Sequence, residues 1–434
     1  MQLPQSKVKK VLCVYGASQT YTSTVFEHLD AFRKYSALSW SYLDISIFNC
    51  ESEDVNSYDA VVVHYSIRLP FGQINDIGVR KLRNFRGAKI LFIQDEYDNT
   101  NIAKKVINSV PFDLVFSVVP GNSIPKIYPP NEFPQTRFVS CLTGYVPDEL
   151  ISQVGKLTSP SKRSLFIAYR GRPLPIRYGR LGQEKVVIGQ HVKTYCHKHG
   201  ISCDIEWDES SRIYGKDWYA FISSAKAMLG SESGSNVFDW DGDLQQIIDH
   251  FRKKSPNVTE NDVYQKIIKE REVDGLMNQI SPRVFETAAA KTVMVLFEGS
   301  YSGVLEPGTH FFSLKKDFSN LDQVLAELRD GLKVDAMADR AYQDIILSGK
   351  YSYRQFVGMV DSEIETLFGM LMRPRTGVVT PSLSKATAYP VRAKPPLPVL
   401  TSPLVKALGR LLIALWQQIP IGVRPYLKRL LGRA

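Results

Sequence analysis

Short apolar runs recur along the first 150 residues, and each run ends in polar residues or in glycine and proline. The clearest runs are KVLCVYGAS, YDAVVVHYS, AKILFIQDEYD and FDLVFSVVPGN. Continuous β-branched runs of this kind are typical of strands buried on both faces, while the stretch over about 22–34 has the pattern of a helix. The alternation of strand and helix predicts a parallel, Rossmann-like sheet.

A second series of the same kind follows the polar link SQVGKLTSPSKRS. It contains the strand SLFIAYRGR, the helix GQEKVVIGQHVKTYCHKHG, the strand ISCDIEW, and a helix and strand in WYAFISSAKAMLGSESGS. A mainly helical stretch over about 244–278 then leads to SPRVFETAAAKTVMVLFEG. The sequence therefore predicts two tandem α/β domains over 1–155 and 160–350, with a closing helix over 351–372.

The end of the chain has a different composition. Residues 373–403 have the proline, serine and basic content of an extended linker. Residues 404–434 read as an apolar helix that prolines interrupt, with basic side chains on one side. This pattern predicts a basic amphipathic segment that lies on an anionic membrane surface and is too interrupted to span it.

Charge supports this division. The 434-residue chain has a formal net charge of +10, but residues 366–434 hold eleven lysines and arginines and no acid. The remaining chain has 43 basic and 44 acidic residues. A neutral body argues against a nucleic-acid partner, and a basic tail rich in Leu, Ile and Trp favours a membrane surface over nucleic acid.

Localisation is predicted from three features together. Five cysteines without a regular framework favour a reducing compartment. The stretch MQLPQSKVKKVLCVYG passes directly into a strand, without the longer apolar core of a signal peptide. No apolar run approaches the roughly 20 residues that span a bilayer. We therefore expect a cytoplasmic protein that is peripheral at the inner face of the membrane.

The stretch SPRVFETAAAKTVMVLFEGSYSG joins a short helix to a buried strand. A serine N-cap and a proline in the first turn begin the helix, and Thr292–Phe297 reads as the strand. Arg283 and Glu286 lie off the apolar face of the helix. Ligands of parallel α/β sheets bind at such strand and helix ends, so these charged side chains are candidates for ligand binding.

This stretch, with HFFSLKKDFSNLDQVLAELRD and KYSYRQFVGMV, resembles the C-terminal domain of GT-B-fold glycosyltransferases, in particular the glycosyl transferases family 1 and spore-maturation-like group. The resemblance covers roughly 160–370 and is mainly architectural over 1–150. It implies two Rossmann-like domains facing a cleft. It also implies transfer of a sugar from a nucleotide-sugar to a glycan, lipid-linked or protein acceptor, without a metal or other cofactor.

In that family, the residue that corresponds to Glu286 accepts hydrogen bonds from the ribose hydroxyls of the donor. A carboxylate suits a vicinal diol because it has two acceptor oxygens, and the helix N-terminus beside it favours the diphosphate. Many retaining members carry a second glutamate at the position of Asn278. The departure at this position leaves the stereochemistry of transfer open.

Two further stretches are candidates for donor binding. IAYRGRPLPIRYGRLGQEK gathers basic residues after a strand, and a departing diphosphate needs such charge when no metal supplies it. GSESGSN offers small residues and backbone N–H groups. The residues expected to bind the donor are Arg170, Arg172, Lys185, Ser233, Gly234, Arg283 and Glu286.

Strand ends in the N-terminal half supply the candidates for catalysis. His64 ends the run AVVVH, and Asp95 and Glu96 follow LFIQ. Each has the chemistry to orient an acceptor or to take its proton, although strand-end residues of these types are also often structural.

Two clusters, DWDGD and YCHKHGISC, contain residue types that bind metals, but their spacing and context argue against a metal site. DWDGD is similar to the DXD motif, but that motif belongs to a single metal-dependent domain rather than to two tandem α/β halves. YCHKHGISC matches no familiar zinc spacing, and its basic residues suit a helix end. We therefore predict no metal site.

Other functions stay open at this point. A non-catalytic nucleotide-sugar-binding protein of the same fold would lack a catalytic base. Another α/β enzyme acting on nucleotide-sugars, such as an epimerase, is the second alternative. The run GASQTY is not a G-x-G-x-x-G fingerprint, which counts against an enzyme that uses NAD.

Overall fold

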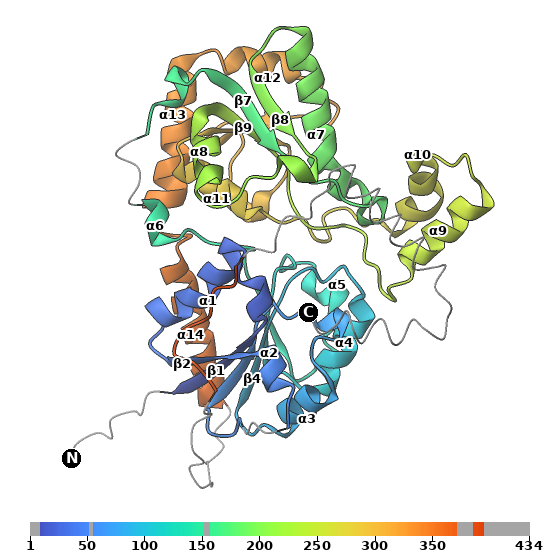
Figure 1. The fold of residues 1–434 in the computed structure, drawn as a ribbon, viewed down its shortest axis with the longest axis vertical. Helices are drawn as coiled ribbons and strands as arrows, with labels where there is room; N and C mark the ends of the chain where they lie inside the picture. Colours follow the sequence, from blue (N-terminus) through green and yellow to red (C-terminus); the bar gives the residue numbers. More distant parts are fainter. Residues whose placement is uncertain (1–8, 52–54, 152–156, 371–384, 395–434) are drawn as a thin grey trace, which may run out of the picture. The chain divides into compact units, whose positions relative to one another are not determined.

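The computed structural model describes residues 9–51, 55–151, 157–370 and 385–394. The fold presented below lies within the unit Met1–Ala393. Two parallel β-sheets organise this unit, and each is flanked by helices (Figure 1).

The first sheet has six strands in the order β2-β1-β3-β4-β5-β6, and every neighbouring pair is parallel. The strands are β1 (Lys10–Tyr15), β2 (Ser39–Asp44), β3 (Ala60–Val63), β4 (Ala88–Ile93), β5 (Leu114–Ser117) and β6 (Arg137–Ser140). The helices of this half are α1 (Ser23–Tyr35), α2 (Ile45–Phe48), α3 (Asp76–Asn84), α4 (Thr100–Ser109) and α5 (Ile124–Ile127). Helix α6 (Asp148–Ile151) follows, and its Leu150 packs in an apolar core of the second half.

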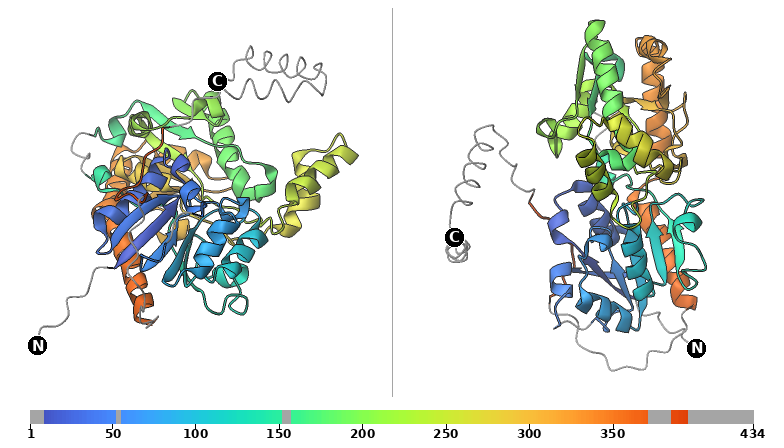
Figure 2. Two further views of the ribbon diagram at one scale, coloured as in Figure 1. Left: turned by 60° about the horizontal axis from the view of Figure 1, so that its bottom comes forward. Right: turned by 90° about the vertical axis from the view of Figure 1, so that its right-hand side faces the viewer.

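Both faces of this sheet are covered, because successive side chains of its strands point to opposite sides. In β1, Leu12 and Val14 enter one apolar core, while Val11 and Cys13 enter the other. Helices lie on both sides of the strands (Figure 2). Helix α14 (Tyr353–Met370) packs beside α1, so the closing helix of the chain completes the core of the first half (Figure 1).

The second sheet has five parallel strands in the order β11-β10-β9-β7-β8. The strands are β7 (Leu165–Arg170), β8 (Cys203–Glu206), β9 (Ala225–Gly230), β10 (Val293–Phe297) and β11 (Phe311–Leu314). The helices of this half are α7 (Gly179–Lys198), α8 (Lys216–Ser224), α9 (Leu244–Lys254), α10 (Glu260–Val263), α11 (Pro282–Ala289), α12 (Leu321–Glu327) and α13 (Gly331–Ala341).

Two parallel sheets with flanking helices are the architecture predicted from the sequence, so the GT-B fold class is confirmed at this level. Strands β2 and β6 were not predicted, because half-exposed residues interrupt their apolar positions.

The end of the described chain makes contacts that the sequence did not predict. Residues 385–394 were assigned to an extended linker over 373–403, but Thr387 pairs with Tyr42 beside the first sheet. Farther along, Val391 N donates to Tyr15 Oη at 2.9 Å. Part of the predicted linker is therefore bound to the first half.

The predicted membrane-surface segment over 404–434 lies outside the described residues, and so does most of the linker. Within the part that the structure describes, no helix combines the length and apolarity needed to cross a bilayer. The amphipathic tail stays a prediction.

Candidate nucleotide-sugar site

Positive charge gathers around the first turns of α7. Lys185 donates a hydrogen bond from Nζ to Ser233 Oγ at 2.9 Å, which joins α7 to the loop after β9. Burial and, after it, the positive charges of Arg283 and Arg172 lower the pKa of Lys185 to about 8. Two guanidinium groups close enough to disfavour a buried ammonium create a field that attracts an anion.

The carboxylates near Lys185 do not neutralise this field, because each has a cation of its own. Glu184 and Asp95 act in the opposite direction and raise the pKa of Lys185. However, Glu184 forms an ion pair with Lys316 at 2.6 Å, and Asp95 lies 3.9 Å from Arg68. The balance therefore stays positive around Lys185.

Helix α11 adds Arg283 and Glu286, which share a neighbour in Trp218 of α8. The guanidinium of Arg283 lies over the Trp218 ring at 5.0 Å and donates to the carbonyl of Arg170 at 2.5 Å. Trp218 Nε1 donates to Glu286 Oε2 at 2.7 Å. Burial raises the pKa of Glu286, and the Trp218 hydrogen bond and Arg283 partly reverse that shift.

The indole thus orients both charged side chains, as Trp and Arg pairs of this kind do. Sequence reasoning missed Trp218, because nothing in WYAFISSAKAMLG distinguishes a positioning tryptophan from a core one. In the described part of the chain, no hydrogen bond is made to Glu286 Oε1. That oxygen is left as an acceptor for a ligand.

The loop that carries Ser233 is fixed by the segment 277–279. Ser233 and Gln279 exchange two backbone hydrogen bonds of 2.7 and 2.8 Å. Gly234 has φ of 101°, and a Cβ there would lie 1.9 Å from the carbonyl oxygen of Met277. Only glycine permits this approach, so Gly234 acts by setting the loop that presents Ser233 to Lys185.

Glu232, in the same loop, was also missed. Its Oε1 accepts from Tyr301 N at 2.7 Å, and its Oε2 accepts from Asn278 Nδ2 at 2.6 Å. Asn278 Oδ1 in turn accepts from Asn236 Nδ2 at 2.8 Å. The residue that stands at the position of the second family glutamate is therefore held in a structural network here.

Arg170 requires a correction. Its guanidinium makes two bonds to the Asp204 carboxylate, at 2.7 and 3.0 Å, and lies over the Phe221 ring at 4.2 Å. An arginine saturated in this way is not available to a phosphate. Its contribution to the site is the backbone carbonyl that receives Arg283, whereas Arg172 is exposed and stays a candidate.

His64 requires a second correction, because it is completely buried and both ring nitrogens are occupied. Nε2 lies 2.9 Å from His28 Nδ1, and Nδ1 lies 2.9 Å from Ser66 Oγ. Ser66 Oγ also accepts from Gly16 N at 2.9 Å. Burial lowers the pKa of His64 well below its ordinary range. This chain of hydrogen bonds ties α1 to the loops after β1 and β3 and is structural.

Asp95 and Glu96 are adjacent in sequence but differ in environment. Asp95 has positive φ of 56°, a side chain that is 52% exposed, and a 2.7 Å hydrogen bond from Tyr97 Oη. Glu96 is fully buried, with Oε1 accepting from Ser117 Oγ at 2.6 Å and Oε2 without a partner among the described residues. Burial raises the pKa of Glu96 to about 8. Asp95 therefore faces solvent, and Glu96 does not.

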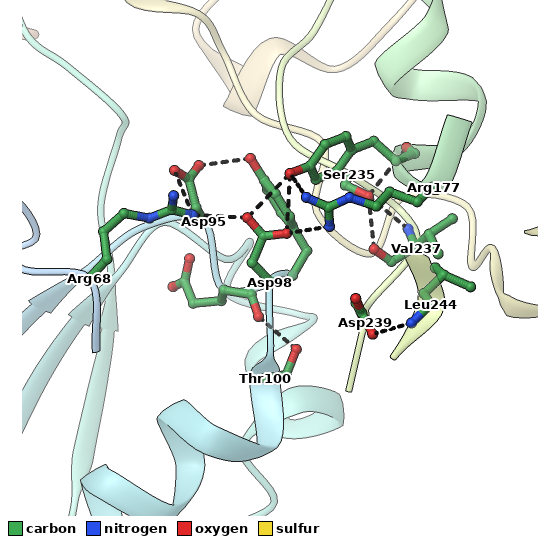
Figure 3. Close-up of polar contacts among 12 residues, drawn as sticks. Arg68, Asp95, Asp98, Thr100, Arg177, Ser235, Val237, Asp239 and Leu244 are labelled. Atoms are coloured by element: carbon green, nitrogen blue, oxygen red, sulfur yellow. Dashed lines mark hydrogen bonds and ion pairs between the residues drawn. The ribbon is translucent and has the colours of Figure 1, made fainter. Parts of the chain in front are cut away.

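An ion-pair network near Asp95 connects the two halves (Figure 3). The buried Asp98 carboxylate lies between Arg68 Nη2 and Arg177 Nη1, each at 2.8 Å. Tyr178 Oη donates to the same carboxylate at 3.2 Å. Asp98 comes from the loop after β4, Arg68 from the loop after β3, and Arg177 and Tyr178 from the short 3-10 turn that precedes α7. It was not predicted, although Asp98 stands in the polar run that ends LFIQDEYD.

The two clusters for which a metal was considered have other partners. Asp239 Oδ1 accepts from Leu244 N at the start of α9, and Asp241 accepts from Asn101 Nδ2 at 2.9 Å. Cys196 lies in the core of the second sheet, and His199 stacks on Tyr195. Over the described ranges, His, Cys, Asp and Glu side chains form no group with the geometry of a metal site.

No protein-family model matches this sequence, and no curated protein matches it. Among solved structures, the chain is similar to an α-glucosyltransferase in complex with UDP and a 13-mer DNA, at 9% identity and a TM-score of 0.49, over 83% of this chain and 100% of that one. It is also similar to HepE from Anabaena in complex with UDP and glucose, at 9% identity and a TM-score of 0.48, over 82% and 100%.

A third similar structure is the sucrose-phosphate synthase of Thermosynechococcus elongatus, at 11% identity and a TM-score of 0.43, over 83% of this chain and 100% of that one. The first two of these structures contain UDP, and the first is named a glucosyltransferase.

Proposed function

We propose that this chain is a glycosyltransferase that moves a sugar from a nucleotide-sugar to a hydroxyl acceptor. The observation that carries the proposal is the half-buried Lys185, which donates to Ser233 Oγ at 2.9 Å and whose pKa is lowered by burial and then by the charges of Arg283 and Arg172. Burying an ammonium among guanidinium groups is unfavourable in the free protein. A diphosphate would remove that penalty, and Glu286 on the same helix as Arg283 would accept hydrogen bonds from the ribose.

In the proposed reaction, the acceptor oxygen forms a bond to the anomeric carbon while the bond from that carbon to the diphosphate breaks. The electron pair leaves on the diphosphate, where Lys185, Arg172 and Arg283 stabilise the new charge. The acceptor proton passes to Asp95. Of the three predicted catalytic residues, Asp95 is the one that faces solvent near Lys185.

Three cations that stabilise the leaving group make a divalent metal unnecessary in this scheme. We further propose a glycan or lipid-linked acceptor, because residues 404–434 have the pattern of a membrane-surface segment. The tail would keep the protein near acceptors at the inner membrane face, and the body would bind no nucleic acid.

Turnover by an Asp95→Asn variant tests the assignment of the proton acceptor. Asparagine keeps the shape of the side chain but cannot take a proton at this position. We expect release of nucleoside diphosphate to fall by roughly 100-fold or more, on the scale of general-base catalysis, with diphosphate affinity unchanged. An Asp241→Asn variant, whose carboxylate bonds Asn101, is the control. Turnover equal to wild type in Asp95→Asn would remove Asp95 from the mechanism.

A further inference from the structure

Tyr97, in the loop between β4 and α4, is a residue to which the proposed reaction gives no role. Its hydroxyl donates to Asp95 Oδ1 at 2.7 Å. Burial, and after it the charge of Asp95, raises the pKa of Tyr97, so the hydroxyl keeps its proton and remains a donor. The hydrogen bond therefore fixes the carboxylate of the proposed proton acceptor.

This hydrogen bond distinguishes the two oxygens of the Asp95 carboxylate. Oδ1 is occupied by Tyr97, whereas Oδ2 forms an ion pair with Arg68 Nη2 at 3.9 Å, a distance longer than a hydrogen bond. Among the described residues, no hydrogen bond is donated to Oδ2. The side chain is half-exposed, so Oδ2 is the oxygen that an acceptor hydroxyl can reach.

The loop that carries both residues has a constrained backbone. Asp95 and Asn99 have φ of 56° and 50°, in the left-handed region that is unfavourable for residues other than glycine and least so for Asp and Asn. Asp98 N donates to Asp95 O at 3.1 Å within the loop. A backbone of this kind persists where surrounding contacts hold it, and two sets of contacts come from the second half.

The first set holds the backbone of the loop and comes from the segment 237–243. Asp239 N donates to Tyr97 O at 2.8 Å, and Thr100 N donates to Asp239 O at 3.2 Å. These bonds form a parallel bridge between Asp98 and Asp239. The main chain of Tyr97 is therefore fixed by a segment of the other half.

The second set holds the ring of Tyr97. The ring of Tyr178, in the turn before α7, meets it edge to face, with centroids 5.4 Å apart and planes at 82°. Tyr178 Oη donates to the buried Asp98 carboxylate at 3.2 Å. Arg177 Nη1 donates to the same carboxylate at 2.8 Å (Figure 3). The Asp98 network thus holds Tyr178 against Tyr97, and Tyr97 holds Asp95.

We propose that Tyr97 is a positioning residue for Asp95 and that Tyr178 fixes Tyr97, so that residues of both halves aim Asp95 Oδ2 at the acceptor hydroxyl. The inference rests on the proposed function. In that reaction, the proton of the acceptor hydroxyl moves to Oδ2, and its electron pair stays on the oxygen that bonds to the anomeric carbon. Holding one carboxylate oxygen gives the other a defined direction, which proton transfer requires.

The test measures release of nucleoside diphosphate by the full-length protein from UDP-, GDP- and ADP-glucose, with octyl glucoside as the acceptor. Tyr97→Phe removes the hydroxyl and keeps the ring that contacts Tyr178. We expect kcat to fall roughly tenfold, the scale of losing a hydrogen bond to a charged group, while KM and diphosphate affinity stay unchanged. Tyr35→Phe is the matched control, because it removes a hydroxyl that donates to another carboxylate, Asp148, at 2.6 Å, and it should leave kcat unchanged.

Double variants separate positioning from a structural role. Tyr178→Leu alone should lower kcat as Tyr97→Phe does. In a protein that carries Asp95→Asn, whose residual turnover is the reference, neither substitution should lower kcat further, because both act through the Asp95 carboxylate. A further loss beside Asp95→Asn would show a structural role and overturn the inference, as would wild-type kcat in Tyr97→Phe. Wild-type kcat in Tyr178→Leu would overturn the part of the second half.

Failure of the proposed function would look different. In that case the wild-type protein releases no diphosphate from any of the three nucleotide-sugars, and the inference falls with it. Release by the wild type, together with an equal kcat in Tyr97→Phe, contradicts only the role of Tyr97.

Discussion

Replacing Lys185 by methionine should stabilise the fold and weaken diphosphate binding at the same time. Methionine fills a similar volume without a charge. The pKa of Lys185 falls from an ordinary value of 10.5 to about 8 in the folded protein. Since one pKa unit is about 1.4 kcal/mol, the buried charge costs on the order of 1–3 kcal/mol near pH 7, and the variant should gain about that much.

The pH dependence of this gain has a definite sign. Between about pH 8 and 10.5 the folded protein binds fewer protons at Lys185 than the unfolded chain, so the wild type gains stability as pH rises. The advantage of Lys185→Met is therefore full below about pH 8 and shrinks above it. Urea denaturation at pH 7 and pH 9.5 measures both values.

Binding should respond in the opposite direction. Loss of one charge-assisted contact to a phosphate costs about 1.5–3 kcal/mol, which is roughly 10- to 150-fold in affinity for a nucleoside diphosphate. Lys193→Met is the matched control, because Lys193 lies on the same helix and pairs with Glu206 at 2.6 Å in a partly exposed position. A Lys185→Met protein that is less stable than wild type, or that binds the diphosphate as tightly, would refute the reasoning.

Glu286→Ala should weaken nucleotide-sugar binding by about 1–3 kcal/mol and leave the fold intact, because only Trp218 donates to its carboxylate in the described structure; unchanged calorimetric affinity contradicts the ribose role. Turnover should persist in EDTA, since Lys185, Arg172 and Arg283 stabilise the leaving group; activity lost in EDTA and restored by manganese shows that a metal is needed. Glu27→Gln should be more stable than wild type at pH 8 but not at pH 4. The pKa of the Glu27 carboxyl is about 7 in the folded protein and about 4.5 in the unfolded chain, so the stability of the wild type falls as pH rises from 4.5 to 7. Identical pH dependence of the two proteins in urea denaturation would contradict this prediction. The full chain should co-sediment with anionic liposomes at low salt, and a chain that ends at Lys394 should not. The shortened chain keeps the contacts of Thr387 and Val391 with the first half. Equal sedimentation of the two proteins would contradict the membrane role of residues 404–434.

Much of the fold could be predicted because its strands are buried on both faces. Continuous apolar runs such as AVVV and AKILFI can be recognised as strands without knowing which strands they pair with, and they form β3 and β4. Strand β2 is different, because its buried Trp40 and Tyr42 alternate with half-exposed polar residues. Residues 39–44 can be assigned as a strand only once their pairing with β1 is known, and a single sequence does not show that pairing.

Candidate residues of the site could be selected only where the neighbouring sequence marks them. Arg283 and Glu286 were selected from the sequence because a local helix and strand frame them, and Lys185 because it stands in a basic run. Whether a charged side chain is free depends on distant partners. Asp204 occupies Arg170, and His28 occupies His64, across 34 and 36 residues of sequence.

The central claim is tested most directly by calorimetric titration of wild-type protein and Lys185→Met with UDP, GDP, ADP and CDP at pH 7. We predict that at least one diphosphate binds the wild type, that its sugar ester competes with it, and that Lys185→Met loses roughly tenfold or more of the affinity. The account is contradicted if none of the four binds the wild type, or if the variant binds as the wild type does.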